Sequence, residues 1–365
     1  MHRVPGAGTA LATPPDLAVE PLVAAVTETA VRVLRPCVEE TAEAGVPRSH
    51  LDALAACGAY GLIAYEPDPA SGVAARRVTR EVHELLAAAD PSTWFVWTQH
   101  HALAKGLLRG GDAALGEAWL PALARGDRRA TAGFAFLRHP RPPVTAEREP
   151  GGWRLSGRVP WMTGWGLADV VYLGALTPSD EVLFAPVDCA PGAGLASAPS
   201  APLWAMRGTR TAAVEVRGVF VPDAEVVVRE PRADWVRAYD LENADAQPAV
   251  FGQLRATADF LLDSEGHEDL GLRIADRAAR LRAEAYALRD ELPPGERPAD
   301  RLRLRAESLD LAVRAASACV AVAGGRAIQY GNTAGRLSRE AQFHLVQAQT
   351  GGLKREVARL MVDGP

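Results

Sequence analysis

The stretch GGWRLSGRVPWMTGWGLAD (Gly151–Asp169) decides how the centre of this 365-residue chain folds. Trp153 and Leu155 alternate with polar neighbours, and a second apolar run follows at residues 159–162. Alternation with a period of two is typical of a strand that has one buried face. Because the turn-forming pair Ser156–Gly157 separates the two runs, we expect a β-hairpin whose turn lies at this pair.

Further short runs follow the quoted stretch. Residues 170–176 (VVYLGAL) and 181–187 (EVLFAPV) are apolar almost throughout, and residues 212–222 carry valine at positions 214, 216, 219 and 221. Short runs rich in β-branched residues are typical of strands. Residues 129–230 are therefore expected to form a β domain.

Apolar residues recur at helical spacing on both sides of this β domain. Helices are expected before it, at 17–43, 47–58, 75–89 and from Trp94 to Leu108, and after it, at about 248–263, 269–290, 299–328 and 336–361. We therefore expect an α+β fold, with an N-terminal helical domain (18–128) and a C-terminal four-helix bundle (231–365). Residues 1–17 are rich in Gly, Pro, Ala and Thr without periodicity, and a loose lead-in is expected there.

Three motifs resemble those of one family, the acyl-CoA dehydrogenase superfamily. The quoted stretch matches the G-W-x-L-x-G-x-x-x-W-(I/V/M)-T run of that family's middle β domain, which is followed by Ala-Asp. The matching residues are Trp153, Leu155, Gly157, Trp161, Met162, Thr163, Ala168 and Asp169. Leu120–Gly126 resembles the turn that closes the family's helical domain, and Arg207–Thr211 resembles its R-G-(S/T)-x-T run. The resemblance covers nearly the whole chain and implies the family's three-domain fold.

The resemblance also implies a flavin site. In the family, the second Trp packs on the flavin ring and the Thr hydrogen-bonds near its reactive nitrogen, so Trp161 and Thr163 are the expected contacts and FAD the expected cofactor. Gly324 and Gly325 match a Gly-Gly turn at which bare backbone approaches a pyrophosphate, and Thr350 corresponds to the adenosine end. The alternative for Trp161 is a buried aromatic residue of a β core.

The expected catalytic base is missing from its usual place. The family removes a proton with a Glu whose pKa is raised by burial, and in many members this Glu precedes Gly-Thr, where this chain has Ala348. Other members carry the base on the first helix of the C-terminal domain, within a stretch that residues 239–243 (YDLEN) resemble. Glu242 is therefore one candidate base, with a Glu that stabilises a helix start as the alternative. His344, one helical turn before Ala348, is the second candidate, with a buried structural His as the alternative.

Two segments depart from the family's cofactor and substrate pattern. Residues 137–140 (LRHP) replace a T-E-P-x-(A/G)-G-S-D loop, so that hydroxyl groups are lost and a cation replaces an acid. Residues 263–269 (DSEGHED) are acidic where the family grips FAD from a neighbouring subunit, and acidic residues repel a pyrophosphate. These changes favour weak or altered FAD binding, FMN in its place, or the use of reduced flavin.

Three functions remain open from the sequence. The first is a flavin-dependent oxidoreductase that oxidises an acyl thioester or a related small molecule and passes electrons to a partner protein. The second is a monooxygenase that uses reduced flavin supplied by a flavin reductase. The third is a catalytically silent homologue that binds a ligand or serves as a structural partner. The family plan implies a homodimer or homotetramer packed through the C-terminal bundle.

Composition narrows the remaining classes of function. A hydrophobic content of 48% with 23% charged residues is ordinary for a globular protein, and a net charge of −5 without a basic cluster argues against a nucleic-acid partner. The four cysteines are widely spaced, and the neighbouring His100 and His101 point about 100° apart on a helix, so no metal site is expected. No long apolar run or signal sequence is recognised, so a cytoplasmic protein without a membrane partner is expected.

Overall fold

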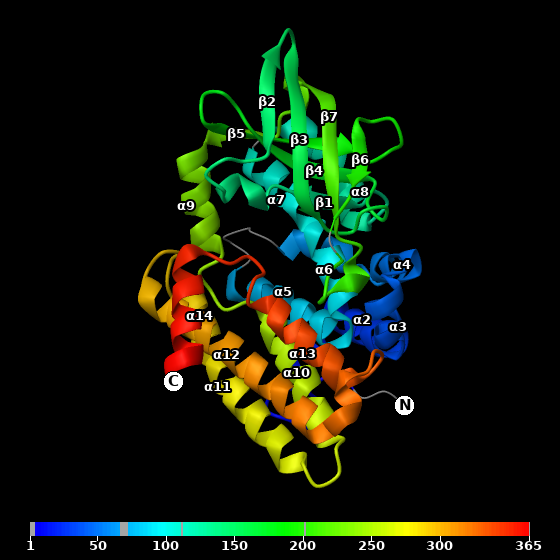
Figure 1. Cartoon of the computed structure of the whole chain (residues 1–365), viewed down its shortest axis with the longest axis vertical. Helices are drawn as coiled ribbons and strands as arrows, with labels where there is room; N and C mark the ends of the chain where they lie inside the picture. Colours follow the sequence, from blue (N-terminus) through cyan, green and yellow to red (C-terminus); the bar gives the residue numbers. More distant parts are fainter. Residues whose placement is uncertain (1–3, 66–71, 111, 201, 365) are drawn as a thin grey trace.

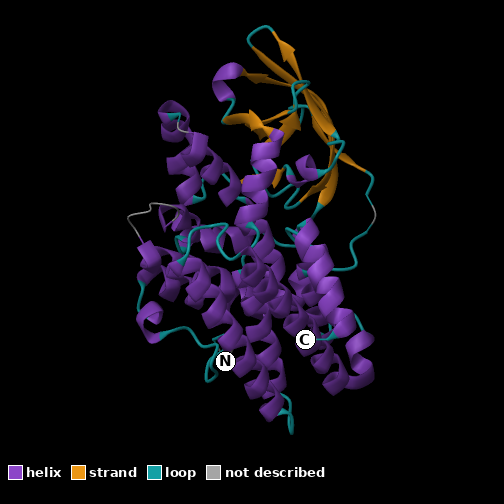
Figure 2. Ribbon diagram, turned by 90° about the vertical axis from the view of Figure 1, so that its left-hand side faces the viewer, coloured by secondary structure: helices purple, strands orange, loops and turns teal. Residues whose placement is uncertain are grey.

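The computed structural model describes residues 4–65, 72–110, 112–200 and 202–364. A sheet forms one end of the molecule, a bundle of long helices forms the other, and the N-terminal helices lie beside and between them (Figure 1, Figure 2). This is the α+β arrangement that the sequence predicts.

The N-terminal part is helical up to residue 125. Its elements are α1 (Pro15–Ala18), α2 (Pro21–Thr29), η1 (Ala30–Leu34), η2 (Arg35–Cys37), α3 (Val38–Ala44), α4 (Arg48–Ala56), η3 (Ala59–Tyr65), α5 (Gly72–Ala89), α6 (Pro91–Gln99), α7 (His101–Gly110) and α8 (Ala113–Arg125). The single helix expected over 17–43 is interrupted by a π-helical turn and a 3₁₀ turn at residues 30–37. Pro36 lies in this interruption, where its missing N–H and its ring prevent a regular α-helix.

The first residues of the chain are packed rather than loose. Leu11 is fully buried in the hydrophobic core of the C-terminal bundle. The backbone N–H of Gly6 donates to Asp259 Oδ1 at 3.1 Å, and Thr13 Oγ1 donates to Glu81 Oε1 at 2.7 Å. The expected loose lead-in is therefore wrong for the described residues from Val4 onward, because Gly and Pro content says nothing of tertiary contacts.

The sheet has eight strands in the order β6-β7-β3-β2-β4-β5-β8, with β1 paired to β4. The strands are β1 (Ala130–Gly133), β2 (Val144–Glu149), β3 (Gly152–Met162), β4 (Val170–Leu176), β5 (Glu181–Asp188), β6 (Leu195–Ala198), β7 (Ala212–Pro222) and β8 (Val228–Pro231). Alternate residues of β4 enter different cores: Val171 and Leu173 pack within the β domain, while Tyr172 packs with α7. Burial on both faces explains why this strand reads as a continuous apolar run.

The expected hairpin exists, but its turn lies elsewhere. β2 pairs antiparallel with β3 up to the pair Glu149 and Gly152, so the turn is at Pro150–Gly151. The predicted turn at Ser156–Gly157 is wrong, because these residues lie inside β3 at an irregularity opposite β7. Gly157 has φ of 138°, and a Cβ there would lie 2.0 Å from the carbonyl oxygen of Pro143. A glycine inside a strand thus marks a bulge and a close approach of backbone here.

The C-terminal part contains more helices than expected. Its elements are α9 (Arg232–Glu242), α10 (Pro248–Leu262), α11 (Glu268–Glu291), α12 (Pro298–Ala323), η7 (Gly324–Ile328), α13 (Thr333–His344) and α14 (Gly351–Asp363), and three short 3₁₀ turns, η4 (Ala135–Arg138), η5 (Arg207–Thr209) and η6 (Asp223–Glu225), lie in the β domain. The helix expected over 336–361 is two helices, α13 and α14, separated by residues 345–350. Ala348 in this connection has φ of 48°, a conformation that interrupts a right-handed helix.

One helical segment of the described residues, Pro298–Ile328, is long and apolar enough by length and composition to cross a membrane, and an 18-residue window within it has a mean hydropathy of 1.4. It comprises α12 and η7. Leu304, Leu309 and Ala312 of this segment lie in the core of the bundle.

Candidate functional site

The flavin contacts that the sequence predicts lie at the end of β3 that points toward the helices (Figure 1). Trp161 is 59% exposed, whereas Trp153 on the same strand is 6% exposed and packs in the β core. The alternative that Trp161 is a buried core aromatic is therefore wrong. An exposed indole leaves its π-face available to stack on a planar ligand.

Thr163 directly follows β3 and is fixed by its neighbours. Its Oγ1 lies 2.9 Å from Thr211 Oγ1, which lies 2.7 Å from Thr209 Oγ1, and its backbone oxygen accepts a hydrogen bond from Thr131 Oγ1. The chain of hydroxyl groups comes from the Arg207–Thr211 motif that the sequence singles out. The structure thus brings two of the three family motifs together at this point.

The three residues expected at the dinucleotide end are Gly324, Gly325 and Thr350. The two glycines have open space beside their backbone, and the hydroxyl group of Thr350 accepts one hydrogen bond. A Cβ built on Gly324 or Gly325 would meet no atom within 4 Å, and Gly324 has φ of 64°. Thr350 caps α14, where its Oγ1 accepts from the N–H of Leu353 at 3.2 Å. The hydroxyl proton of Thr350 remains able to donate to a ligand. These features fit a turn that a phosphate group can approach.

Glu242 lies neither at a helix start nor in a buried position, as the two interpretations of the sequence would require. It is the last residue of α9 and is exposed. A carboxylate at a helix C-terminus opposes the macrodipole, so the helix-start interpretation is wrong. Glu242 is also open to solvent, whereas the family's catalytic Glu is expected to be buried.

His344, the second candidate, ends α13 and is 2% exposed. Its ring centroid lies 6.1 Å from that of Trp94 and 5.6 Å from that of Phe343. Burial, and to a lesser degree the nearby Arg305, lower the pKa of His344 to about 4. The imidazole is therefore neutral at pH 7, and its buried Nδ1 has no hydrogen-bond partner.

Sequence reasoning missed Arg305 of α12. This guanidinium is 2% exposed and donates to the backbone oxygens of Asn243, Gln347 and Ala348. Burial lowers the pKa of Arg305 to about 10, which leaves it protonated at pH 7. At Ala348, where the family's Glu is expected, the backbone oxygen therefore accepts a hydrogen bond from the buried Arg305 cation. No sequence signal pointed to Arg305, because Arg301, Arg303 and Arg305 alternate with leucines and arginine is usually an exposed residue.

Arg138, which the sequence does single out, lies at the end of η4. Its Nε is 3.7 Å from Asp240 Oδ1, and its guanidinium carbon is 4.9 Å from the ring centroid of Tyr239. The charge of Arg138 acts on Arg305, and both guanidinium groups act on Tyr239. The cation in the 137–140 loop and the buried cation of α12 thus belong to one cluster.

A buried carboxyl group that the sequence did not single out as a site lies on α13, one helical turn before His344. Glu340 of α13 is 3% exposed, and burial raises its pKa to about 7 although Arg336 Nη1 lies 2.7 Å from its Oε2. It lines a small pocket with Ser92, Trp204 and Met206. Over the described ranges, no group of three or more His, Cys, Asp and Glu side chains is placed to hold a metal ion.

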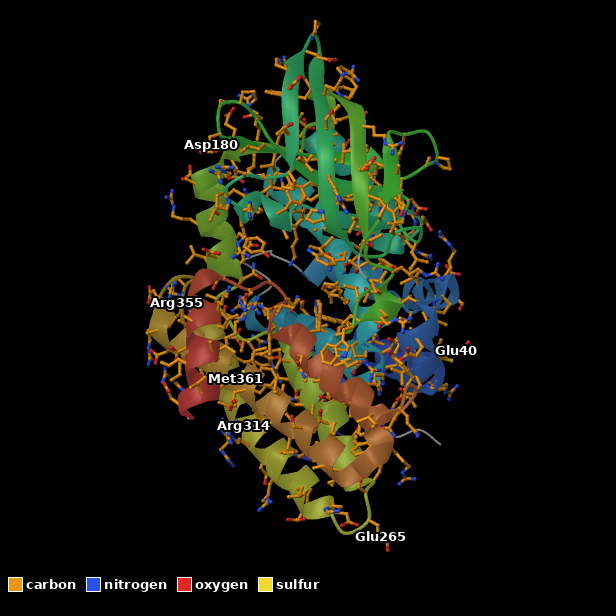
Figure 3. The ribbon with its side chains drawn as sticks, viewed as in Figure 1. Glu40, Asp180, Glu265, Arg314, Arg355 and Met361 are labelled. Carbon is orange, nitrogen blue, oxygen red and sulfur yellow. The ribbon has the colours of Figure 1, made fainter. Side chains whose placement is uncertain are left out.

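The acidic run at residues 263–269 lies far from these residues. It forms the connection between α10 and α11, and Glu265 marks the tip of the bundle opposite the sheet (Figure 3). Within one chain, this run therefore does not contact the end of β3.

Comparison with known proteins identifies the fold. Residues 19–127 match the family model described as the N-terminal domain of acyl-CoA dehydrogenase, and no curated protein sequence matches the chain significantly. The structure is similar to butyryl-CoA dehydrogenase from Megasphaera elsdenii, with a TM-score of 0.76, 17% identity and coverage of 95% of this chain and 97% of the other. It is also similar to a glutaryl-CoA dehydrogenase from Mycobacterium smegmatis in complex with FADH2, with a TM-score of 0.74, 17% identity and coverage of 96% and 95%.

A third similar structure has a different activity. Dibenzothiophene monooxygenase from Paenibacillus sp. A11-2 matches with a TM-score of 0.74, 18% identity and coverage of 94% of this chain and 97% of the other. The resemblance to the superfamily and the predicted fold are thus confirmed, while one fold accommodates both kinds of reaction.

Proposed function

We propose that the chain, whose residues 19–127 match the N-terminal domain of acyl-CoA dehydrogenase and whose fold is that of the acyl-CoA dehydrogenase superfamily, is a flavin-dependent oxidoreductase. Trp161 and Thr163 would hold the flavin ring, and Gly324, Gly325 and Thr350 would serve the dinucleotide end of FAD. Bound flavin would supply the redox chemistry that this chain's own side chains lack. The substrate is an acyl thioester or a related small molecule.

The exposed indole of Trp161 carries this proposal. A tryptophan side chain that is 59% exposed at a strand end, beside buried Met162 and Thr163, gains little from its position in the isolated chain. Stacking on an isoalloxazine ring would bury that apolar surface. The neighbouring Thr163 hydroxyl would then fix the ring's orientation.

The first test is flavin binding to Trp161→Ala. Because an aromatic stacking contact contributes about 0.5–1.5 kcal/mol, we expect the Kd for FAD, measured by quenching of flavin fluorescence, to rise about 3- to 10-fold. Phe220→Ala, which removes another exposed aromatic ring (42% exposed) near the end of β7 that is remote from Thr211, is the matched control and should leave the Kd unchanged. Equal Kd values in the wild-type protein and Trp161→Ala would contradict the assignment, and no visible flavin absorption with FAD or FMN would favour a silent homologue.

A second candidate is a monooxygenase that receives reduced flavin from a reductase. It is favoured by one observation: Ala348 stands where the dehydrogenases carry a Glu, and its carbonyl accepts from Arg305. A site without a carboxylate at position 348 is better suited to oxygen chemistry than to removal of a proton next to a carbonyl group. If this candidate is correct, reduced flavin and O₂ together should yield an oxygenated product, whereas free reduced flavin in air yields only hydrogen peroxide. Acyl thioesters should fail to bleach the flavin without oxygen.

The dehydrogenase reaction makes the opposite prediction. Acyl thioesters should bleach bound flavin anaerobically, and Glu242→Gln should abolish the bleaching if Glu242 is the base. Bleaching that persists in Glu242→Gln removes Glu242 from that role and leaves His344 and Glu340 as the groups to replace next.

We also propose a homo-oligomer. Ile328 and Tyr330, which follow the Gly324–Gly325 turn, are 88% and 75% exposed. Apolar side chains so exposed beside a cofactor-binding turn are typical of a surface that a second subunit covers. Light scattering after gel filtration would measure the mass, and Ile328→Lys should lower it.

A further inference from the structure

Arg305 is a buried charge without a counter-ion. Among the described residues, no carboxylate lies within 4.0 Å of its guanidinium nitrogens, and its buried Nε has no hydrogen-bond partner. Asp245, the carboxylate that acts on it over a longer distance, is already engaged by Arg301 and Arg289. Three backbone oxygens solvate Arg305, but they do not neutralise it.

The surroundings of Arg305 add a second cation instead of an acid. Arg138 comes from η4 of the β domain and is paired only loosely with Asp240, at 3.7 Å, and Asp240 Oδ1 is itself buried without a hydrogen-bond partner. Tyr239 interacts electrostatically with both guanidinium groups, and neutral His344 interacts electrostatically with Arg305. We call Arg138, Tyr239, Arg305 and His344 the arginine cluster.

Such a cluster is unfavourable unless something compensates for it. A buried ion without a partner costs several kcal/mol, and two guanidinium groups close together repel each other. Buried unpaired charges are therefore usually found where a ligand supplies the opposite charge. Arginine is particularly suited to a carboxylate, because its fork of N–H groups matches the two oxygens.

We infer that the arginine cluster binds a carboxylate group of the substrate, so that the substrate is an acyl thioester or small molecule carrying a free carboxylate. This inference rests on the proposed function, because it places the carboxylate beside residues 345–350, the segment that carries the base in the dehydrogenases. Arg305 and Arg138 supply the charge, and neutral Tyr239 and His344 supply polar groups that do not compete for the anion. The segment around Ala348, two of whose backbone oxygens accept from Arg305, is partly exposed and non-helical.

The test compares two thioesters that differ in one group. Succinyl-CoA and butyryl-CoA have acyl chains of the same length, ending in a carboxylate and in a methyl group, so coenzyme A contacts cancel in their ratio. Binding is measured by isothermal titration calorimetry on the full chain, with and without FAD. A charge-assisted contact predicts that succinyl-CoA binds about tenfold tighter or more. Arg138→Gln and Arg305→Met should reduce the ratio toward one, and Arg305→Lys should keep part of it.

Arg314→Gln is the matched control. Arg314 lies on the same helix, is half exposed and pairs with Asp310 (Figure 3), so its replacement should leave the ratio unchanged. A ratio near one in the wild-type protein, no binding of either ester, or an unchanged ratio in Arg138→Gln would overturn the inference. If the Arg305→Met protein fails to fold, the Arg138→Gln protein alone decides the test, because the side chain of Arg138 is partly exposed. Because the ratio is also measured without FAD, a chain that binds no flavin but prefers succinyl-CoA would refute the proposed function and leave this inference standing.

Discussion

At the scale of single residues, Trp153 and Trp161 show what a pattern can and cannot predict. They are eight positions apart on β3, so a strict period of two places them on the same face of the sheet. The pairing of β3 with β7 shifts between Val159 and Met162, and this shift turns Trp161 out while Met162 stays in the core. The motif predicted that Trp161 is a functional residue, but its exposure is determined by the register of β3 with β7, which the motif does not show.

His344 leads to a prediction about pH. Its pKa in the folded chain is about 4, below the ordinary value near 6.5, so protons bind the unfolded chain more readily. The stability that this difference contributes is fully present above pH 6.5 and is lost as the pH falls toward 4. Between pH 7 and pH 5 we expect His344 to account for a loss of about 2 kcal/mol in the free energy of unfolding.

Urea unfolding of the wild-type protein and His344→Gln at both pH values would measure this loss. The variant should lose less stability than the wild-type protein over this range, although His100, whose pKa burial also lowers to about 4, still contributes to both. Equal losses in the two proteins would show that His344 is not the buried neutral group described.

At the scale of elements, an ion network joins the N-terminal helices to the bundle. Arg255 of α10 is fully buried, with its Nη1 2.7 Å from Glu81 Oε1 and its Nη2 2.6 Å from Glu84 Oε2, both on α5. Arg282 Nη1 of α11 lies 3.2 Å from Glu84 Oε2, and the hydroxyl group of Tyr286 donates a hydrogen bond to Glu84 Oε1 at 2.6 Å. A sequence cannot reveal this network, because each residue reads as part of an exposed helix face.

Arg255→Met should therefore be strongly destabilising. The substitution leaves two carboxylates buried with only part of their counter-charge, so we expect a loss of about 3–5 kcal/mol in the free energy of unfolding. The exposed pair of Arg77 and Asp16, at 2.7 Å, provides the control, since Arg77→Met should cost at most about 1 kcal/mol. Similar urea midpoints for the two variants would mean that the buried network contributes no more than a surface pair.

At the scale of the whole molecule, the order of helices, sheet and helices could be predicted, because periodicity and motifs survive across the chain. The break at residues 30–37 was missed although Pro36 signals it in the sequence. The break at residues 345–350 could not be predicted, since a left-handed alanine interrupts an otherwise continuous helical pattern. The arginine cluster was also hidden, because it forms only when η4, α9, α12 and α13 come together.

The N-terminal segment connects these parts and supports the last prediction. Leu11 is fully buried in the core of the bundle, its backbone oxygen lies 3.4 Å from Arg282 Nη1, and Thr13 reaches Glu81 of α5. Leu11→Ala should thus cost about 2–5 kcal/mol, as for other buried leucines, whereas Val19→Ala, at a side chain that is 79% exposed, should change stability by less than about 0.5 kcal/mol. Removal of residues 1–13 should lower the unfolding midpoint in urea at least as far as Leu11→Ala, because it also removes the bonds to Asp259 and Glu81. A truncated chain as stable as the wild-type protein would show that this segment lies on the bundle without stabilising it.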